Sequence, residues 1–159
     1  MGLVDRRPDS GAAMETLGRH LIVELYGCDP AGLDDVGRVR GAVVAACDAI
    51  GATALQVVAH RFAPQGVTVT VLIAESHLSV HTWPEHGYAA VDFFTCGGLD
   101  PRRGVPALQQ GLGATRGRVH EVVRGLEAHV ARAARLLPDD VTFVSSVEAL
   151  EFSASGHVK

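Results

Sequence analysis

Two consecutive strands predicted near the middle of the chain carry reactive side chains on one face. In SHLSVHTW, residues 76–83, and again in YAAVDFFTCG, residues 88–97, a period of two separates polar from apolar positions. The polar or reactive sides of these strands hold His77, Ser79, His81 and Trp83 on the first, and Asp92, Phe94 and Cys96 on the second. A purely structural core would not need such side chains, so their arrangement indicates a reactive site.

A metal site is the first alternative, because five good ligands fall within forty residues: His60, His77, His81, His86 and Cys96. On one strand, however, His77 and His81 would lie about 13 Å apart, since each residue rises roughly 3.3 Å. Two ligands at that separation cannot hold one ion. The spacing therefore favours no metal.

A hydrolase is the second alternative, with Cys96 or Ser76 as nucleophile and His81 as base. Neither AESHL nor FTCGG has the G-x-S-x-G pattern of a nucleophile elbow. Taken singly, each residue also has a structural interpretation: a core histidine, a turn serine and a buried thiol. Taken as a set, they indicate a reactive site.

The scarcity of lysine points to a third chemistry. Thirteen of the fourteen basic residues are Arg, and the one Lys is the terminal Lys159, which excludes pyridoxal phosphate held on a buried lysine. An amino-acid decarboxylase could instead make its electrophilic carbonyl from its own chain. A serine that attacks the preceding carbonyl forms an ester, and elimination and hydrolysis then leave a pyruvoyl group. This needs a strained turn, a neighbouring hydroxyl and a base such as His.

Composition limits the class of protein. The chain has 159 residues, 47% of them hydrophobic, a net charge of −4 and three Cys, which fits one globular domain with free thiols. No basic run is present, so nucleic acid is not an expected partner. Apolar stretches reach only about eight residues, against roughly 20 for a membrane helix, and no signal peptide begins the chain. We expect a cytoplasmic protein.

The hydrophobic pattern predicts an α+β fold, a two-layer sandwich of a mostly antiparallel sheet with helices packed on one face. Strands are expected at residues 17–27, 53–62, 67–75, 76–83, 88–97 and 118–125. Helices are expected at residues 30–50, 106–115 and 126–137, with one more short β-like run at 141–144. Asp29 should cap the first helix and Gly51 should end it.

Three segments of the chain carry a resemblance to a known family. The block ESHLSVHTWPEHGYAAVDFFTCG, Glu75–Gly97, resembles the signature of the prokaryotic S-adenosylmethionine decarboxylase proenzymes. The segments LGRHLIVELYGCD and HRFAPQGVTVTVLIAESH are similar to the same family in order and spacing. The chain then divides into a disordered extension (1–16), a decarboxylase-like domain (17–125) and an added C-terminal helix and tail (126–159).

The resemblance implies a self-processing chain. It would cut itself between Glu75 and Ser76, and Ser76 would become the pyruvoyl group, with no pyridoxal phosphate and no metal. By the same resemblance His81 is the proton acceptor of processing and Cys96 the proton donor of catalysis. Thr68 stands where the family usually has a serine that assists processing.

The resemblance also implies a substrate and a partner. Phe62, Trp83 and Glu85 would line a pocket for S-adenosylmethionine, where aromatic rings stack on adenine or meet the sulfonium and a carboxylate accepts from ribose hydroxyls. The products would be S-adenosylmethioninamine and carbon dioxide, for spermidine biosynthesis, and the chain would self-associate as (αβ)2 or a higher homo-oligomer. The alternatives are a pyruvoyl-dependent ornithine or arginine decarboxylase and a non-catalytic paralogue acting as a binding subunit.

Overall fold

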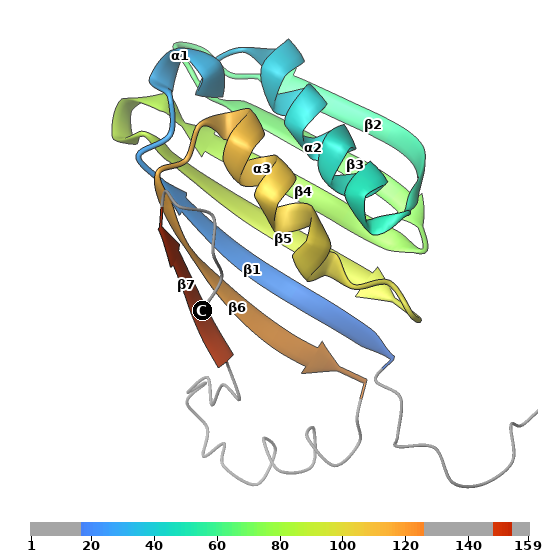
Figure 1. The fold of residues 1–159 in the computed structure, drawn as a ribbon. Helices are drawn as coiled ribbons and strands as arrows, with labels where there is room; N and C mark the ends of the chain where they lie inside the picture. The colour runs from blue at the N-terminus through green and yellow to red at the C-terminus, as the bar shows by residue number, and fades with distance from the viewer. Residues whose placement is uncertain (1–16, 126–147, 154–159) are drawn as a thin grey trace, which may run out of the picture.

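The computed structural model describes residues 17–125 and 148–153, and in them the chain forms one antiparallel sheet with helices on one side (Figure 1). The strand order is β2-β3-β4-β5-β1-β6-β7. The strands are β1 (Gly18–Tyr26), β2 (Thr53–Arg61), β3 (Val67–Ala74), β4 (Ser76–Trp83), β5 (Tyr88–Cys96), β6 (Arg116–Arg124) and β7 (Glu148–Ser153). The predicted α+β class and antiparallel sheet are confirmed.

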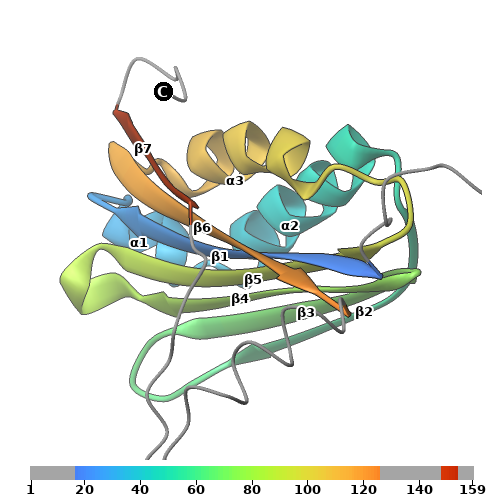
Figure 2. The same ribbon diagram turned by 90° about the horizontal axis from the view of Figure 1, so that it is seen from below.

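The helices in the described residues all lie on one face of the sheet, as Figure 2 shows most clearly. They are α1 (Pro30–Leu33), α2 (Val36–Ile50) and α3 (Val105–Leu112), with short 3-10 turns η1 (Pro84–His86) and η2 (Pro101–Gly104). In β1, Leu21, Val23 and Leu25 are buried beneath them, and the alternate residues point to the other face. None of the described helices is long and apolar enough to cross a membrane.

The predicted helix over residues 30–50 is two helices. Asp29 accepts a hydrogen bond from Ala31 and caps α1, and Gly51 ends α2 with φ 75°, both as predicted. The chain breaks between these ends because Asp35 is extended and accepts from the Arg38 N–H, which caps a second helix. The apolar spacing carries across the break, so periodicity alone did not reveal it.

The structure describes only part of the C-terminal region for which elements were predicted. The predicted helix over residues 126–137 and the β-like run at 141–144 lie outside the described residues. Strand β7, Glu148–Ser153, was not predicted, and it pairs antiparallel with β6 along the edge of the sheet. The segment EALEFS has no clean period of two, which is why no strand was predicted there.

Two helical glycines allow a test of how closely the helical layer is packed. Gly111 of α3 faces α2, and a Cβ added there would lie 2.5 Å from Ala42 Cβ, whereas one added at Gly41 of α2 would meet nothing within 4 Å. We therefore expect Gly111→Ala to lower the free energy of unfolding by about 1–3 kcal/mol. Gly41→Ala should raise it by about 0.5–1 kcal/mol. Urea unfolding of the two variants measures both, and equal signs would contradict the packing.

Candidate active site

The two strands predicted to carry the reactive face are neighbours, with β4 between β3 and β5. The alternation is as predicted: Leu78, Val80 and Thr82 are buried under the helices, while His81 and Trp83 are exposed on the opposite face. Fixed cross-strand pairs therefore decide which side chains meet on that face.

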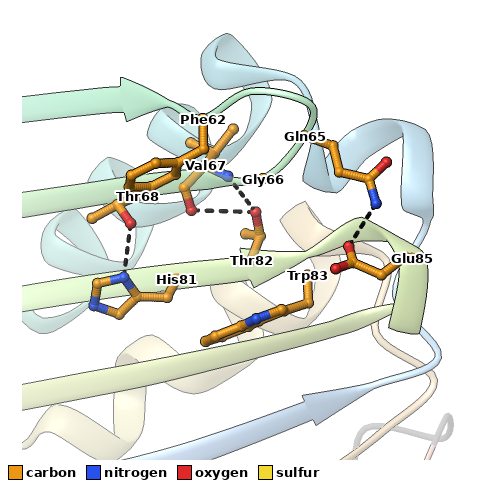
Figure 3. Close-up of a pocket in the computed structure, with 9 residues that line it drawn as sticks. All are labelled: Phe62, Gln65, Gly66, Val67, Thr68, His81, Thr82, Trp83 and Glu85. Carbon is orange, nitrogen blue, oxygen red and sulfur yellow. Dashed lines mark hydrogen bonds between the residues drawn. The ribbon is translucent and has the colours of Figure 1, made fainter.

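A pocket of about 440 Å³ opens at one end of β4 (Figure 3). Its walls come from the β2–β3 turn, the ends of β3 and β4, and η1. The lining residues are Phe62, Gln65, Gly66, Val67, Thr68, His81, Thr82, Trp83 and Glu85. The structure thus brings together five predicted site residues, and it adds four that sequence reasoning missed.

Thr68 and His81 form the polar pair of this pocket. They face each other across β3 and β4, and Thr68 Oγ1 lies 2.7 Å from His81 Nδ1 (Figure 3). This hydrogen bond fixes the plane of the imidazole whichever atom carries the proton. Since Nδ1 is occupied, Nε2 is the nitrogen left to exchange a proton with a bound group.

Trp83 forms the aromatic wall and has a support that the sequence did not suggest. Its ring packs on Tyr88 at 5.2 Å between centroids, and Tyr88 packs on Tyr26 at 5.4 Å. The Tyr88 hydroxyl donates to the Glu24 carboxylate, and burial together with this carboxylate raises the pKa of Tyr88. Trp83 remains 39% exposed, so part of the indole is left for a ligand.

The β2–β3 turn forms one wall of the pocket, and hydrogen bonds and an ion pair hold it in place. Phe62 N–H donates to the Gly66 carbonyl at 2.8 Å, and Gly66 N–H donates to Asp34 Oδ1 at 3.0 Å. Asp34 also pairs with Arg61 at 2.5 Å, and the Arg61 guanidinium and the Gly66 N–H lower the pKa of that carboxyl. Gly66 has φ +100°, and a Cβ there would lie 3.0 Å from the Thr82 carbonyl oxygen.

A buried hydroxyl fastens the same turn to the helical layer. Thr82 Oγ1 accepts from the Val67 N–H and donates to the Leu33 carbonyl oxygen, both at 2.8 Å. Thr82 is 6% exposed, so these bonds satisfy backbone groups that have no access to water. The end of α1 and the start of β3 are thereby held at a fixed separation.

The remaining predicted residues, Glu75, Ser76 and Cys96, lie at the opposite end of β4. Ser76 pairs with Thr95 of β5, so Cys96 is the next residue along that strand. Ser76 has φ +119°, the only positive φ of a non-glycine residue in the described chain, which is a strained conformation. Within one chain His81 is five residues from Ser76, about 16 Å along the strand, so the structure does not bring them together.

The thiols differ in environment. Cys28 and Cys47 are buried, and burial raises the pKa of each to about 11. Cys96 is partly exposed at the end of β5. All three are free, as predicted, and Cys96 is the one placed to meet a ligand. No group of three or more His, Cys, Asp or Glu in the described part of the chain could hold a metal ion.

The Asp34–Arg61 ion pair should make the stability of the fold depend on pH in the acid range. Because the folded pKa of Asp34 is lowered, its carboxylate stabilises the fold above its unfolded pKa of about 3.9, and this stability is lost as pH falls through the folded pKa. Asp34→Asn should lower the urea midpoint at neutral pH, and the difference from the native chain should shrink on acidification toward the folded pKa. Adding Arg61→Gln to Asp34→Asn should cause little further loss. A loss that stays unchanged in acid would contradict this.

Comparison with known proteins agrees with the geometry. Residues 19–125 match the family model described as S-adenosylmethionine decarboxylase. The S-adenosylmethionine decarboxylase proenzyme of Prochlorococcus marinus (strain MIT 9313) is 48% identical over 120 residues, which span 75% of this chain and 96% of the relative. That of Geobacillus kaustophilus (strain HTA426) is 44% identical over 124 residues, 78% of this chain and 100% of the relative.

A solved structure shows the same fold. The crystal structure of the adenosylmethionine decarboxylase from Aquifex aeolicus superposes with a TM-score of 0.65 at 32% identity, covering 81% of this chain and 99% of the other. The sequence matches span well over half of the chain and nearly the full length of the relatives. The protein therefore belongs to the S-adenosylmethionine decarboxylase family.

Proposed function

We propose that the chain cuts itself between Glu75 and Ser76 and then converts S-adenosylmethionine to S-adenosylmethioninamine and carbon dioxide. The product is the aminopropyl donor for spermidine in the pathway that the family serves. The observation that carries the proposal is the positive φ of Ser76, a strained serine at the position where the family resemblance puts the cut.

The cut uses groups that the chain possesses. Ser76 Oγ attacks the Glu75 carbonyl carbon, the peptide C–N bond breaks, and an ester forms. A base then removes the Ser76 α-proton, the Glu75 carboxylate leaves, and addition of water with loss of ammonia gives a pyruvoyl end. This group supplies an electrophilic carbonyl and an electron sink for the substrate amine. The chain fits this group, because Ser76 offers a hydroxyl on strained backbone, and Cys96 directly follows Thr95, the residue that pairs with Ser76 on β5.

The pocket suits an adenosyl sulfonium. Phe62 and Trp83 provide aromatic faces for a base or a cation, and Glu85 provides acceptors for ribose hydroxyls. None of the pocket-lining residues is Lys or Arg, so the lining holds no permanently charged cation to pair with the Glu85 carboxylate. Ornithine and arginine, the alternative substrates, have no ribose hydroxyls that could donate to Glu85. Cys96 Sγ donates the one proton that decarboxylation consumes.

The separation of Ser76 from His81 within one chain is the reason to propose a paired assembly. We propose that two copies pack through the sheet faces that no described helix covers. If the two-fold axis lies between the two faces and perpendicular to the strands, the strands of one copy run opposite to those of the other. His81 and Thr68 of one copy then come beside Ser76 and Cys96 of the other. Apolar side chains exposed on that face support the packing: Ile22, Val58 and Leu72.

Two substitutions separate cutting from turnover. Ser76→Ala should remain one chain, because it lacks the attacking hydroxyl. Cys96→Ala should still give two chains ending and starting at residues 75 and 76, but lose turnover by about 100-fold or more, since the proton donor is gone. Intact-protein mass spectrometry and product analysis with S-adenosylmethionine measure both. Two chains from Ser76→Ala would refute the cut site, and a fully active Cys96→Ala would remove Cys96 from the reaction.

The shared site predicts complementation between inactive chains. His81→Ala and Ser76→Ala should each stay uncut alone. When they are co-expressed, the Ser76 of the His81→Ala chain faces an intact His81, so roughly half of the His81→Ala chains should be cut in an equal mixture of dimers. Different affinity tags identify the chains by mass. The matched control co-expresses the His81→Ala chain with a chain that carries both Ser76→Ala and His81→Ala, and it should restore no cutting. If the mixture also stays uncut, the shared site is wrong.

A further inference from the structure

The hydrogen bond between Gln65 and Glu85 joins two separate walls of the pocket. Gln65 Nε2 donates to Glu85 Oε2 at 2.8 Å, from the β2–β3 turn to η1 (Figure 3). The two residues are 20 positions apart in the chain, so the contact is a feature of the folded pocket rather than of local sequence. Nothing in the sequence singled out Gln65.

Both ends of this bond are attached to fixed backbone. The turn that carries Gln65 is held by the Gly66 N–H to Asp34 Oδ1, and by its own closing bond from the Phe62 N–H. On the other side, the Gly87 N–H donates to the Pro84 carbonyl, and the Gly87 carbonyl accepts from the Cys28 N–H at 2.9 Å. The side chains are exposed, yet the positions from which they extend are set.

The donor to Glu85 is a neutral amide, and this affects the charge of the carboxylate. A primary amide donates to one carboxylate oxygen without neutralising the charge, whereas Lys or Arg at this position would form an ion pair. Glu85 therefore keeps its negative charge, and its Oε1 stays available for a ligand. Held in one orientation, the carboxylate can accept from two adjacent hydroxyls at once, and less side-chain entropy is lost on binding.

We infer that Gln65 is a positioning residue that orients the Glu85 carboxylate and so makes the pocket selective for a ligand with a vicinal diol. The inference rests on the proposed function, in which that diol belongs to the ribose of S-adenosylmethionine. Gln65 touches no reacting atom in this scheme. Its effect should fall on recognition and leave the chemistry of Ser76 and Cys96 unchanged.

Binding without turnover gives the decisive test. Trp83 is the single tryptophan of the chain and lines the pocket, so its fluorescence reports ligand binding directly. The native processed protein should bind adenosine about tenfold more tightly than 2′,3′-dideoxyadenosine, as expected for a lost hydrogen-bonded pair. Gln65→Ala should reduce this ratio below about twofold and leave the affinity for dideoxyadenosine unchanged. Gln110→Ala, an exposed glutamine on α3, is the matched control and should keep the native ratio.

Kinetics separates positioning from a structural role. For Gln65→Ala, KM for S-adenosylmethionine should rise by about three- to tenfold, while kcat changes little and self-cleavage is complete. If the native protein prefers adenosine and Gln65→Ala keeps that preference, the inference about Gln65 is overturned while the proposed function stands. If the native protein does not discriminate between the two nucleosides, the ribose role of Glu85 is wrong, and the role of Gln65 is wrong with it.

Discussion

The hydrogen-bonded register of β3, β4 and β5 is the constraint on which the site depends. It sets Thr68 opposite His81, Trp83 opposite Tyr88, and Ser76 opposite Thr95. A slip of one residue would turn Thr68, His81 and Trp83 from the open face to the other face, toward the helices. The buried side chains of the same strands oppose such a slip, because it would expose Leu78 and Val80 to water. The apolar face therefore holds the reactive face in place.

The helices act on the pocket from the far side of the sheet. Thr82 of β4 links the sheet to the helical layer, because its hydroxyl bonds to the Leu33 carbonyl oxygen at the end of α1 and to the Val67 N–H at the start of β3. Asp34, at the break between α1 and α2, holds the turn that carries Phe62 and Gln65. Asp34 is the C-cap residue of α1, so its carboxylate reaches the turn from the end of that helix.

The sequence predicted what depends on local pattern. The period of two in SHLSVHTW placed His81 and Trp83 on one face because a strand has only two faces. The helix break was not predicted, because the apolar spacing carries across it while the Asp35 side chain caps a second helix through the Arg38 N–H. Tyr88 and Gln65 were missed because their roles arise from partners across the sheet and across the pocket. Family resemblance supplied Phe62 and Glu85, which no periodicity marked.

Under the proposed assembly, the distance along β4 has a consequence for when the chain is cut. A rigid strand holds Ser76 about 16 Å from the His81 of its own chain, and no rotation of side chains can close that gap. A lone chain then has strain at Ser76 without the acid–base group that would release it. Pairing supplies that group at the same time as it buries the apolar face, so cutting follows assembly rather than folding alone. The geometry of one strand would in this way delay the making of a reactive carbonyl until a closed site exists to contain it.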